Sequence, residues 1–282
     1  MVQAARAITA PHSIGQLLQY WRKTRNLSQL ALASEAEVSP RHLCFVETGR
    51  SRPSREMVLH LARALDVPLR EQNALLLAAG FAPRYAEASL DAPELAPVRS
   101  ALDAILRQQQ PFPAVVLNRR WDIVGANAAA GSFFAWLLDG PAPEPANVLR
   151  LMFDPRGLRP HVANWEAVAG ALLQRVQREA VGGVQDAATT ALVRSLLAAP
   201  DLPPRLLRAN LEAPLLPVVP VSFARDGQRY DFFSAVTTLG TPQDVTVQEL
   251  RIEAFFPANP ETERAARAAA VAGTFAPAPL QA

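Results

Sequence analysis

Cysteine and lysine are almost absent from this sequence of 282 residues, since each occurs once, as Cys44 and Lys23. A single cysteine excludes an internal disulfide and any metal site built from several cysteines. Of the four histidines only His161 lies beyond residue 84, so a histidine-rich metal site is not expected in the longer part of the chain. Arginine is abundant, and its excess over lysine indicates the codon composition of a GC-rich bacterial genome.

Long hydrophobic runs and catalytic motifs are missing too. No stretch of about 18 uncharged apolar residues occurs, and residues 1–12 lack the pattern of a signal peptide. We therefore expect a cytoplasmic protein without a membrane span. The sequence has no glycine-rich phosphate loop and no Ser–His–Asp order with a supporting motif. We do not expect an enzyme, a metal or a catalytic cofactor.

Length and charge distribution indicate two domains. Residues 1–83 carry ten Lys and Arg against six Asp and Glu, whereas residues 84–282 carry eighteen Arg against twenty acidic residues. A small basic part joined to a larger acidic part is typical of a DNA-binding domain attached to a regulatory one. A chance scatter of charges remains the alternative.

Helix-start signals recur closely in the first 80 residues. Ser13 with Gln16 fits a capping box, and Pro40 fits the first helical position after a cap. Helices are expected after Ser13, Ser28, Ser39 and Ser54 and at Pro68. Together they predict an all-α domain of five short helices. Residues 27–54 have the pattern of a helix-turn-helix followed by a basic loop, a motif whose second helix enters the DNA major groove.

This region resembles the Cro/repressor-like helix-turn-helix of the XRE family, from about Ser13 to Arg84. The resemblance rests on the spacing of Leu27-Ser28-Gln29, Leu32-Ala33, Val38-Ser39, Glu47-x-Gly49 and Pro53-Ser54. It implies that operator DNA is contacted by Ser28, Gln29, Ser39, Arg41, His42, Phe45, Arg50, Arg52 and Arg55. It also implies an internal ion pair between Arg22 and Glu47.

The implied DNA contacts have physical reasons. Ser28 and Gln29 stand at a helix N-terminus, where exposed N–H groups and a polar side chain can hold a phosphate. Arg41 can donate two hydrogen bonds to a guanine, and the ring of Phe45 can touch a thymine methyl. Other readings stay open: Phe45 as a core residue, and His42 and the loop arginines as solvated side chains.

Two positions depart from the family pattern. Glu37 stands in the turn where the family usually has glycine, and positive φ there would cost about 1 kcal/mol. Cys44 stands where a small polar residue is common, and we interpret it as a packed small side chain.

The longer part of the chain alternates strand and helix patterns. Strands are predicted at 114–117, 121–124, 218–224, 230–239 and 246–256, the last with a bulge near Gln248. Helices are predicted at 97–109, 126–138, 146–153, 161–180 and 184–199, with a short one after Asn259-Pro260. A five-stranded antiparallel sheet with helices on one face, an α+β architecture, accounts for this order. We predict a DNA-binding domain at 1–83, a linker at 84–97 and a second domain at 98–282.

This second part resembles the ligand-binding domain of MmyB-like transcription regulators, which has a PAS-like fold. The matching segments are residues 111–127, 147–165 and 239–259, together with 67–83 at the end of the first domain. The resemblance implies a bacterial one-component regulator that binds operator DNA and a small apolar molecule, such as a fatty acid. We expect a homodimer, because such domains read paired half-sites.

Apolar side chains on the predicted helices and strands form the expected ligand site. The set is Phe133, Phe134, Leu137, Leu149, Met152, Phe153, Asn164, Leu172, Val176, Phe223, Phe232 and Phe255. An acidic ligand would need a polar anchor, with Arg150, Arg159, His161, Asn164 and Arg178 as candidates. Alternatively these residues form a filled core, and the second domain serves only for dimerisation or partner docking. A haem held by His161 is a further alternative, and Asn127 and Asn147 are interpreted as capping residues.

Overall fold

The computed structural model describes residues 13–181, 187–206, 218–273 and 275. Contacts between residues divide the chain into two units. Unit 1 comprises Met1–Ala88, Glu179–Ala187 and Thr241–Gln248, and unit 2 comprises Ser89–Arg178, Ala188–Gly240 and Glu249–Ala282. The limits predicted from the sequence, 1–83, 84–97 and 98–282, stay a prediction.

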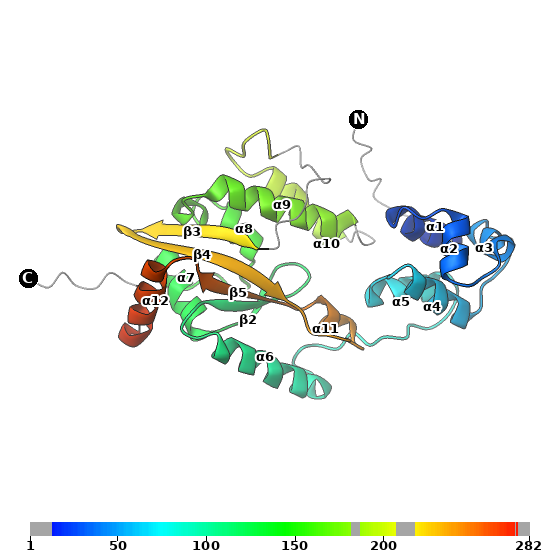
Figure 1. Cartoon of the computed structure of the whole chain (residues 1–282), viewed down its shortest axis with the longest axis horizontal. Helices are drawn as coiled ribbons and strands as arrows, with labels where there is room; N and C mark the ends of the chain where they lie inside the picture. The colour runs from blue at the N-terminus through cyan, green and yellow to red at the C-terminus, as the bar shows by residue number, and fades with distance from the viewer. Residues whose placement is uncertain (1–12, 182–186, 207–217, 274, 276–282) are drawn as a thin grey trace, which may run out of the picture. The chain divides into compact units, whose positions relative to one another are not determined.

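Unit 1 contains the five predicted N-terminal helices (Figure 1). They are α1 (Ile14–Thr24), α2 (Gln29–Glu35), α3 (Pro40–Glu47), α4 (Arg55–Ala64) and α5 (Leu69–Ala78). The serines at 13, 28, 39 and 54 all cap helices as predicted, and Gln16 completes the capping box. The helices enclose a core around Leu18, Trp21 and Val46, which are fully buried.

Gly15 allows α1 and α3 to pack closely. A Cβ atom at this position would lie 2.3 Å from the carbonyl oxygen of Glu47, which belongs to the backbone of α3. Backbone cannot move aside as the end of a flexible side chain can, so the contact between the two helices requires glycine here.

Unit 1 also contains all but the last residue of α11 (Val245–Glu249), where the sequence predicted the first half of a strand at 246–256. That prediction was wrong for residues 246–249: the phase change near Gln248 marks a helical turn and not a bulge. The segment is bonded to the end of the N-terminal region. The Val245 amide donates to the Ala86 carbonyl at 2.8 Å, and the Leu69 amide donates to Oε1 of Gln248 at 2.7 Å.

Unit 2 is built on the predicted five-stranded antiparallel sheet, with the order β2-β1-β5-β4-β3. Its strands are β1 (Ala114–Leu117), β2 (Ile123–Ala126), β3 (Val219–Arg225), β4 (Gln228–Thr237) and β5 (Arg251–Pro257). Strand β5 lies between β1 and β4, so a segment late in the sequence pairs with the first strand of the sheet.

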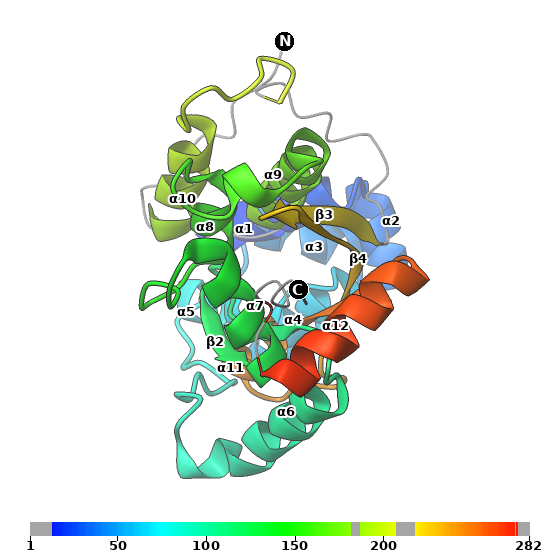
Figure 2. The ribbon, with the colours of Figure 1, turned by 90° about the vertical axis from the view of Figure 1, so that its left-hand side faces the viewer.

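The helices of unit 2 follow the predicted order, with small shifts of their ends. They are the 3-10 turns η1 (Pro93–Leu95) and η2 (Arg159–His161), and the α-helices α6 (Ala96–Gln108), α7 (Ala128–Leu138), α8 (Val148–Phe153), α9 (Trp165–Val181), α10 (Ala187–Leu197) and α12 (Pro260–Ala272). Asn127 and Asn147 cap α7 and α8, which confirms their interpretation as capping residues. Figure 2 shows α12 beside β4, where the Asp231 amide donates to the Thr262 hydroxyl at 2.9 Å.

Helices cover both faces of the sheet, whereas the sequence predicted one. One face carries Val115, Phe223 and Phe255 and packs into the larger core with α7, α8 and α9. The other face carries Ala114, Val116 and Ile252 and packs against Leu102 and Leu106 of α6. In Figure 1, α6 and α9 accordingly lie on opposite sides of the strands. Both faces of the central strands are therefore buried, so side chains on either face of β5 can lie in a core.

Candidate DNA-binding surface and ligand cavity

Three of the four arginines predicted to contact DNA are exposed on unit 1, and the fourth, Arg55 at the start of α4, is half-buried. Arg41, in the first turn of α3, is exposed, and so are Arg50 and Arg52 in the loop after that helix. The guanidinium of Arg41 lies 5.4 Å from the centre of the half-buried Phe45 ring. The stacked ring and the guanidinium present a flat cationic surface at the start of the predicted recognition helix.

The two cap serines combine a structural role with the predicted phosphate contact. Oγ of Ser28 accepts the Ala31 amide at 3.0 Å, and Oγ of Ser39 accepts the His42 amide at 3.5 Å. A hydroxyl that accepts one hydrogen bond still has its own proton to donate. Both side chains therefore remain suited to a phosphate oxygen.

The Gln29 side chain is hydrogen-bonded to α3, and its contact with DNA stays a prediction. Its side-chain nitrogen donates to Oε2 of Glu47 at 2.7 Å. One of the two amide protons is thus engaged with α3, and the second amide proton and the N-terminal backbone of α2 stay suited to a phosphate.

The predicted ion pair between Arg22 and Glu47 is confirmed. Nε and Nη2 of Arg22 donate to the two carboxylate oxygens at 2.7 and 2.9 Å, and Nη1 donates to the Leu27 carbonyl at 3.0 Å. The Glu47 side chain is completely buried, and its hydrogen bond with Arg22 raises the pKa of the guanidinium. The pair therefore stabilises the packing of α1 on α3.

Glu37 adopts the backbone conformation that its turn requires of glycine. Its φ angle is +50°, in the left-handed region, and its amide donates to the Ser34 carbonyl at 3.2 Å. Glu37 thus occupies the left-handed conformation considered for this position from the sequence.

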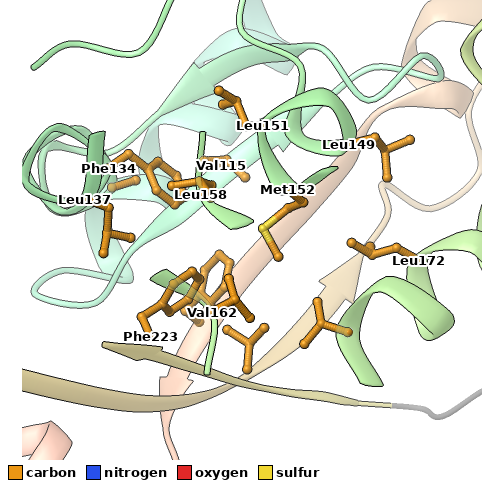
Figure 3. Close-up of a cluster of buried hydrophobic side chains, with 14 of the residues drawn as sticks. Val115, Phe134, Leu137, Leu149, Leu151, Met152, Leu158, Val162, Leu172 and Phe223 are labelled. Carbon is orange, nitrogen blue, oxygen red and sulfur yellow. The ribbon is translucent and has the colours of Figure 1, made fainter. Parts of the chain in front are cut away.

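Unit 2 contains a cavity between the sheet and the helices α7, α8 and α9. It encloses about 50 Å³ of free space. Seventeen of the described residues line it, and fourteen of these are apolar: Val115, Ile123, Phe134, Val148, Leu151, Met152, Leu158, Val168, Ala171, Leu172, Val219, Val221, Phe223 and Phe255. Figure 3 shows the Met152 side chain amid this cluster, with Phe223 of β3 and Leu172 of α9 around it.

Five of the twelve predicted ligand residues line this cavity: Phe134, Met152, Leu172, Phe223 and Phe255. Six others, Phe133, Leu137, Leu149, Phe153, Val176 and Phe232, are buried in the surrounding core instead. Phe133 is the centre of an aromatic cluster in which the rings of Phe223, Phe232 and Phe275 lie 5.0 to 5.7 Å from its own. That cluster forms a packed wall behind the cavity.

Asn164, the twelfth predicted residue, has a structural role. Its Nδ2 donates to the Pro220 carbonyl at 3.0 Å, and its Oδ1 accepts the Ser222 amide at 3.0 Å. Both ends of the amide are thus engaged with the backbone of β3, and the side chain does not line the cavity.

Arg150, Arg159 and His161 do not line the cavity either. Arg150 is exposed, and Arg159 lies 4.0 Å from the centre of the Trp165 ring. His161 is half-buried, and burial together with a neighbouring arginine lowers its pKa. The side chain of Arg178 lies outside the described residues.

Three polar residues that sequence reasoning missed do line the cavity: Arg175, Ser234 and Glu253. Alternation along β5 puts Ile252 and Glu253 on opposite faces of the sheet. Because the sheet is covered on both faces, Glu253 faces the cavity and is 8% exposed. Burial raises the pKa of its carboxyl, opposed by a hydrogen bond from Ser234 and by the charge of Arg175.

The described residues hold no cluster of three or more histidine, cysteine, aspartate or glutamate side chains suited to a metal ion. Within the same ranges, every helix is too short or too polar to cross a lipid bilayer.

Comparison with known proteins identifies both parts of the chain. A helix-turn-helix family model matches residues 18–72. The model described as "MmyB-like transcription regulator ligand binding domain" matches residues 98–269, more than half of the chain.

One curated relative and one solved structure are more distant. Multiprotein-bridging factor 1 of Candida albicans (strain SC5314 / ATCC MYA-2876) is 34% identical over 61 residues, which are 22% of this chain and 40% of that protein. The chain thus spans less than half the length of this relative. The structure "Structure of an RNA-binding Light-Oxygen-Voltage Receptor" aligns at 16% identity over 96% of this chain and 67% of its own, with a TM-score of 0.24, too low to support a structural argument.

Proposed function

This chain belongs to the family of MmyB-like transcription regulators, and we propose that it is a bacterial one-component regulator whose operator binding responds to a small apolar ligand. The presence of both domains makes it a DNA-binding transcription regulator. The proposal adds a fatty acid or similar molecule as the ligand, a PAS-like second domain and a homodimer that reads paired half-sites. The observation that carries it is the apolar cavity of unit 2.

DNA binding is assigned to the start of α3 and the loop that follows it. In this proposal Arg41 contacts a guanine edge, and Arg50 and Arg52 contact phosphates; the exposure of all three side chains supports it. Replacing Arg50 or Arg52 with glutamine should weaken binding to every DNA sequence and reduce the salt dependence by about one counterion each. Replacing Arg41 should relax the preference for one base pair.

Ligand binding would enlarge the cavity. Ligand pockets commonly have volumes of about 300–1,000 Å³, whereas this one encloses about 50 Å³. An acyl chain can enter only if helices α8 and α9 move away from β3, β4 and β5. Flexible Met152 and the rotamers of Leu172 make that side the more deformable wall.

A route from the cavity to the N-terminal region follows from the chain itself. Ser234 of β4 and Glu253 of β5 line the cavity, and α11 is the segment that joins these two strands. Residues 241–248 belong to unit 1, with Gln248 bonded to Leu69 at the start of α5. A ligand that displaces β4 and β5 would therefore pull on a segment anchored in unit 1.

The test uses the full chain and a DNA duplex selected by it from a random library. We expect its affinity for that duplex to change at least fivefold with saturating dodecanoic acid. We also expect mass spectrometry of the denatured protein to detect a co-purified lipid whose acyl chain is about as long as that of dodecanoic acid. Unchanged DNA affinity across saturating lipid would contradict the ligand switch.

A second candidate function is favoured by the small cavity volume: a DNA-binding regulator whose second domain only dimerises or docks a partner. In that case the cavity is a packing defect, no lipid binds, and filling it by Ala171→Leu leaves DNA binding unchanged. If the first function holds, this substitution abolishes the response to dodecanoic acid.

A further inference from the structure

The polar side chains of the cavity are grouped at one position of the sheet. Glu253 of β5 pairs with Val115 of β1, and Ser234 of β4 pairs with Phe255 of β5. Residues 253 and 255 share a face, so Ser234 and Glu253 are diagonal neighbours on the side that faces the helices. Arg175 approaches from α9. The remaining described lining is apolar, so the cavity has one polar end.

Two arginine side chains act on the charge of Glu253. Arg175 of α9 and Arg251 of β5 both favour its charged form, and Ser234 of β4 hydrogen-bonds to it. The two guanidinium groups lie 5.1 and 4.5 Å from the centre of the Trp121 ring. The side chains that face the cavity from β1, α7 and α8 are apolar, with Val115 as the one from β1. Desolvation nevertheless outweighs these groups and raises the pKa of Glu253 above its ordinary value of 4.5.

We infer that Glu253, Ser234 and Arg175 bind the head of the ligand, and that this head carries a carbonyl oxygen beside an O–H or N–H donor, as in a carboxylic acid or a primary carboxamide. The ligand donor lies on Glu253, and the carbonyl oxygen accepts from the Arg175 guanidinium, while the Ser234 hydroxyl donates its proton to Glu253 and so orients that carboxyl. The inference rests on the proposed function, because it needs a ligand in the cavity.

The two head groups differ in their proton requirement. An amide N–H can donate directly to the Glu253 carboxylate. A ligand carboxylate cannot approach a second carboxylate unless one proton is shared between them. Binding of an acid therefore takes up one proton from solvent, and its affinity rises as pH falls. The rise belongs to the pH range above the pKa of Glu253, which burial raises above its ordinary value, because below that pKa the shared proton is already on the Glu253 carboxyl.

The experiment measures the affinity of the full chain for dodecanoic acid, dodecanamide and dodecanol by calorimetry between pH 5.5 and 8. We expect the affinity for the acid to rise by up to about tenfold per unit of falling pH, the limit for one proton. The affinity for the amide should stay constant, and dodecanol, without a carbonyl, should bind at least about tenfold more weakly than the amide.

Two variants isolate the polar end. Glu253→Gln should bind the acid without pH dependence, because its amide supplies the donor at every pH. Arg175→Gln should lower the affinity for dodecanoic acid more than the affinity for dodecanol. Glu261→Gln, at an exposed position of α12, is the matched control and should keep the wild-type slope. Thermal unfolding of each variant, followed by circular dichroism, verifies that it is folded.

The outcomes separate this inference from the proposed function. Acid binding without pH dependence in the wild type, or equal binding of dodecanol and dodecanamide, overturns the assignment of the polar end and leaves the apolar-ligand function standing. No binding of any of the three molecules overturns both.

Discussion

Glu37 has a backbone conformation that glycine adopts readily and that residues with a Cβ atom rarely adopt. Its φ of +50° is strained for a residue with a Cβ, at a cost of roughly 1–2 kcal/mol. Glycine removes this strain but loses about 0.5–1 kcal/mol of backbone entropy on folding. We therefore expect Glu37→Gly to increase the free energy of unfolding by about 0.5–1 kcal/mol, measured by urea denaturation.

The control for that substitution is Glu56→Gly, an exposed glutamate inside helix α4. Here glycine has no strain to relieve and should lower stability by about 1 kcal/mol. If both substitutions destabilise the chain equally, the left-handed conformation at position 37 carries no strain.

The pair of Arg22 and Glu47 should be sensitive to loss of one partner. Glu47→Ala leaves a guanidinium that is 11% exposed without its carboxylate, which costs about 3–5 kcal/mol in buried pairs. We expect a loss of this size in chemical denaturation. Replacing both residues with leucine should recover most of it, because no charge is then left buried. A double variant as unstable as Glu47→Ala would show that the loss comes from packing and not from charge.

At the scale of elements, the contact of α1 with α3 depends on Gly15. Gly15→Ala adds a Cβ that meets backbone at 2.3 Å, so the helices must separate, at a cost of about 1–3 kcal/mol. The control is Gly131→Ala in α7, where no atom lies within 4 Å and glycine is exposed. There alanine should stabilise by about 0.5–1 kcal/mol. Differential scanning calorimetry measures both, and equal shifts in melting temperature would contradict the close packing.

How well the sequence predicted each element depended on whether its signal was local. The N-caps at Ser13, Ser28 and Ser39 are local hydrogen bonds, and the structure has all three. The strand predicted at 246–256 depended on alternation alone. Its first part is α11, a five-residue helix with too few turns to show a helical period.

The polar end of the cavity could not be predicted for a related reason. Alternation says which side chains share a face, but not which faces are covered. Ile252 and Glu253 are both buried, because α6 covers one face of β5 and α9 the other. Asn164 was placed in the ligand site because the sequence does not reveal that β3, more than 50 residues later, satisfies its amide.

At the scale of the whole molecule, the response to ligand depends on the segment between β4 and β5. Gln248 accepts the first amide of α5, a helix whose N-cap, Pro68, provides no side-chain hydrogen bond. In the proposed regulator this bond links residues 241–248 to the rest of unit 1. Without it, displacement of the strands is transmitted less well to the DNA-binding helices.

We therefore expect Gln248→Ala to reduce the coupling between dodecanoic acid and DNA, defined as the ratio of DNA affinities with and without ligand. Allosteric couplings are typically about 5–150-fold, and the variant should bring the ratio towards one. Affinity for the ligand alone should stay unchanged, because Gln248 does not line the cavity. Gln108→Ala, at the exposed end of α6, should keep the full ratio. If Gln248→Ala also keeps the full ratio, the coupling between ligand and DNA does not depend on Gln248. The reason is that the substitution removes the hydrogen bond from the Leu69 amide to Gln248, which is the described bond between this residue and α5.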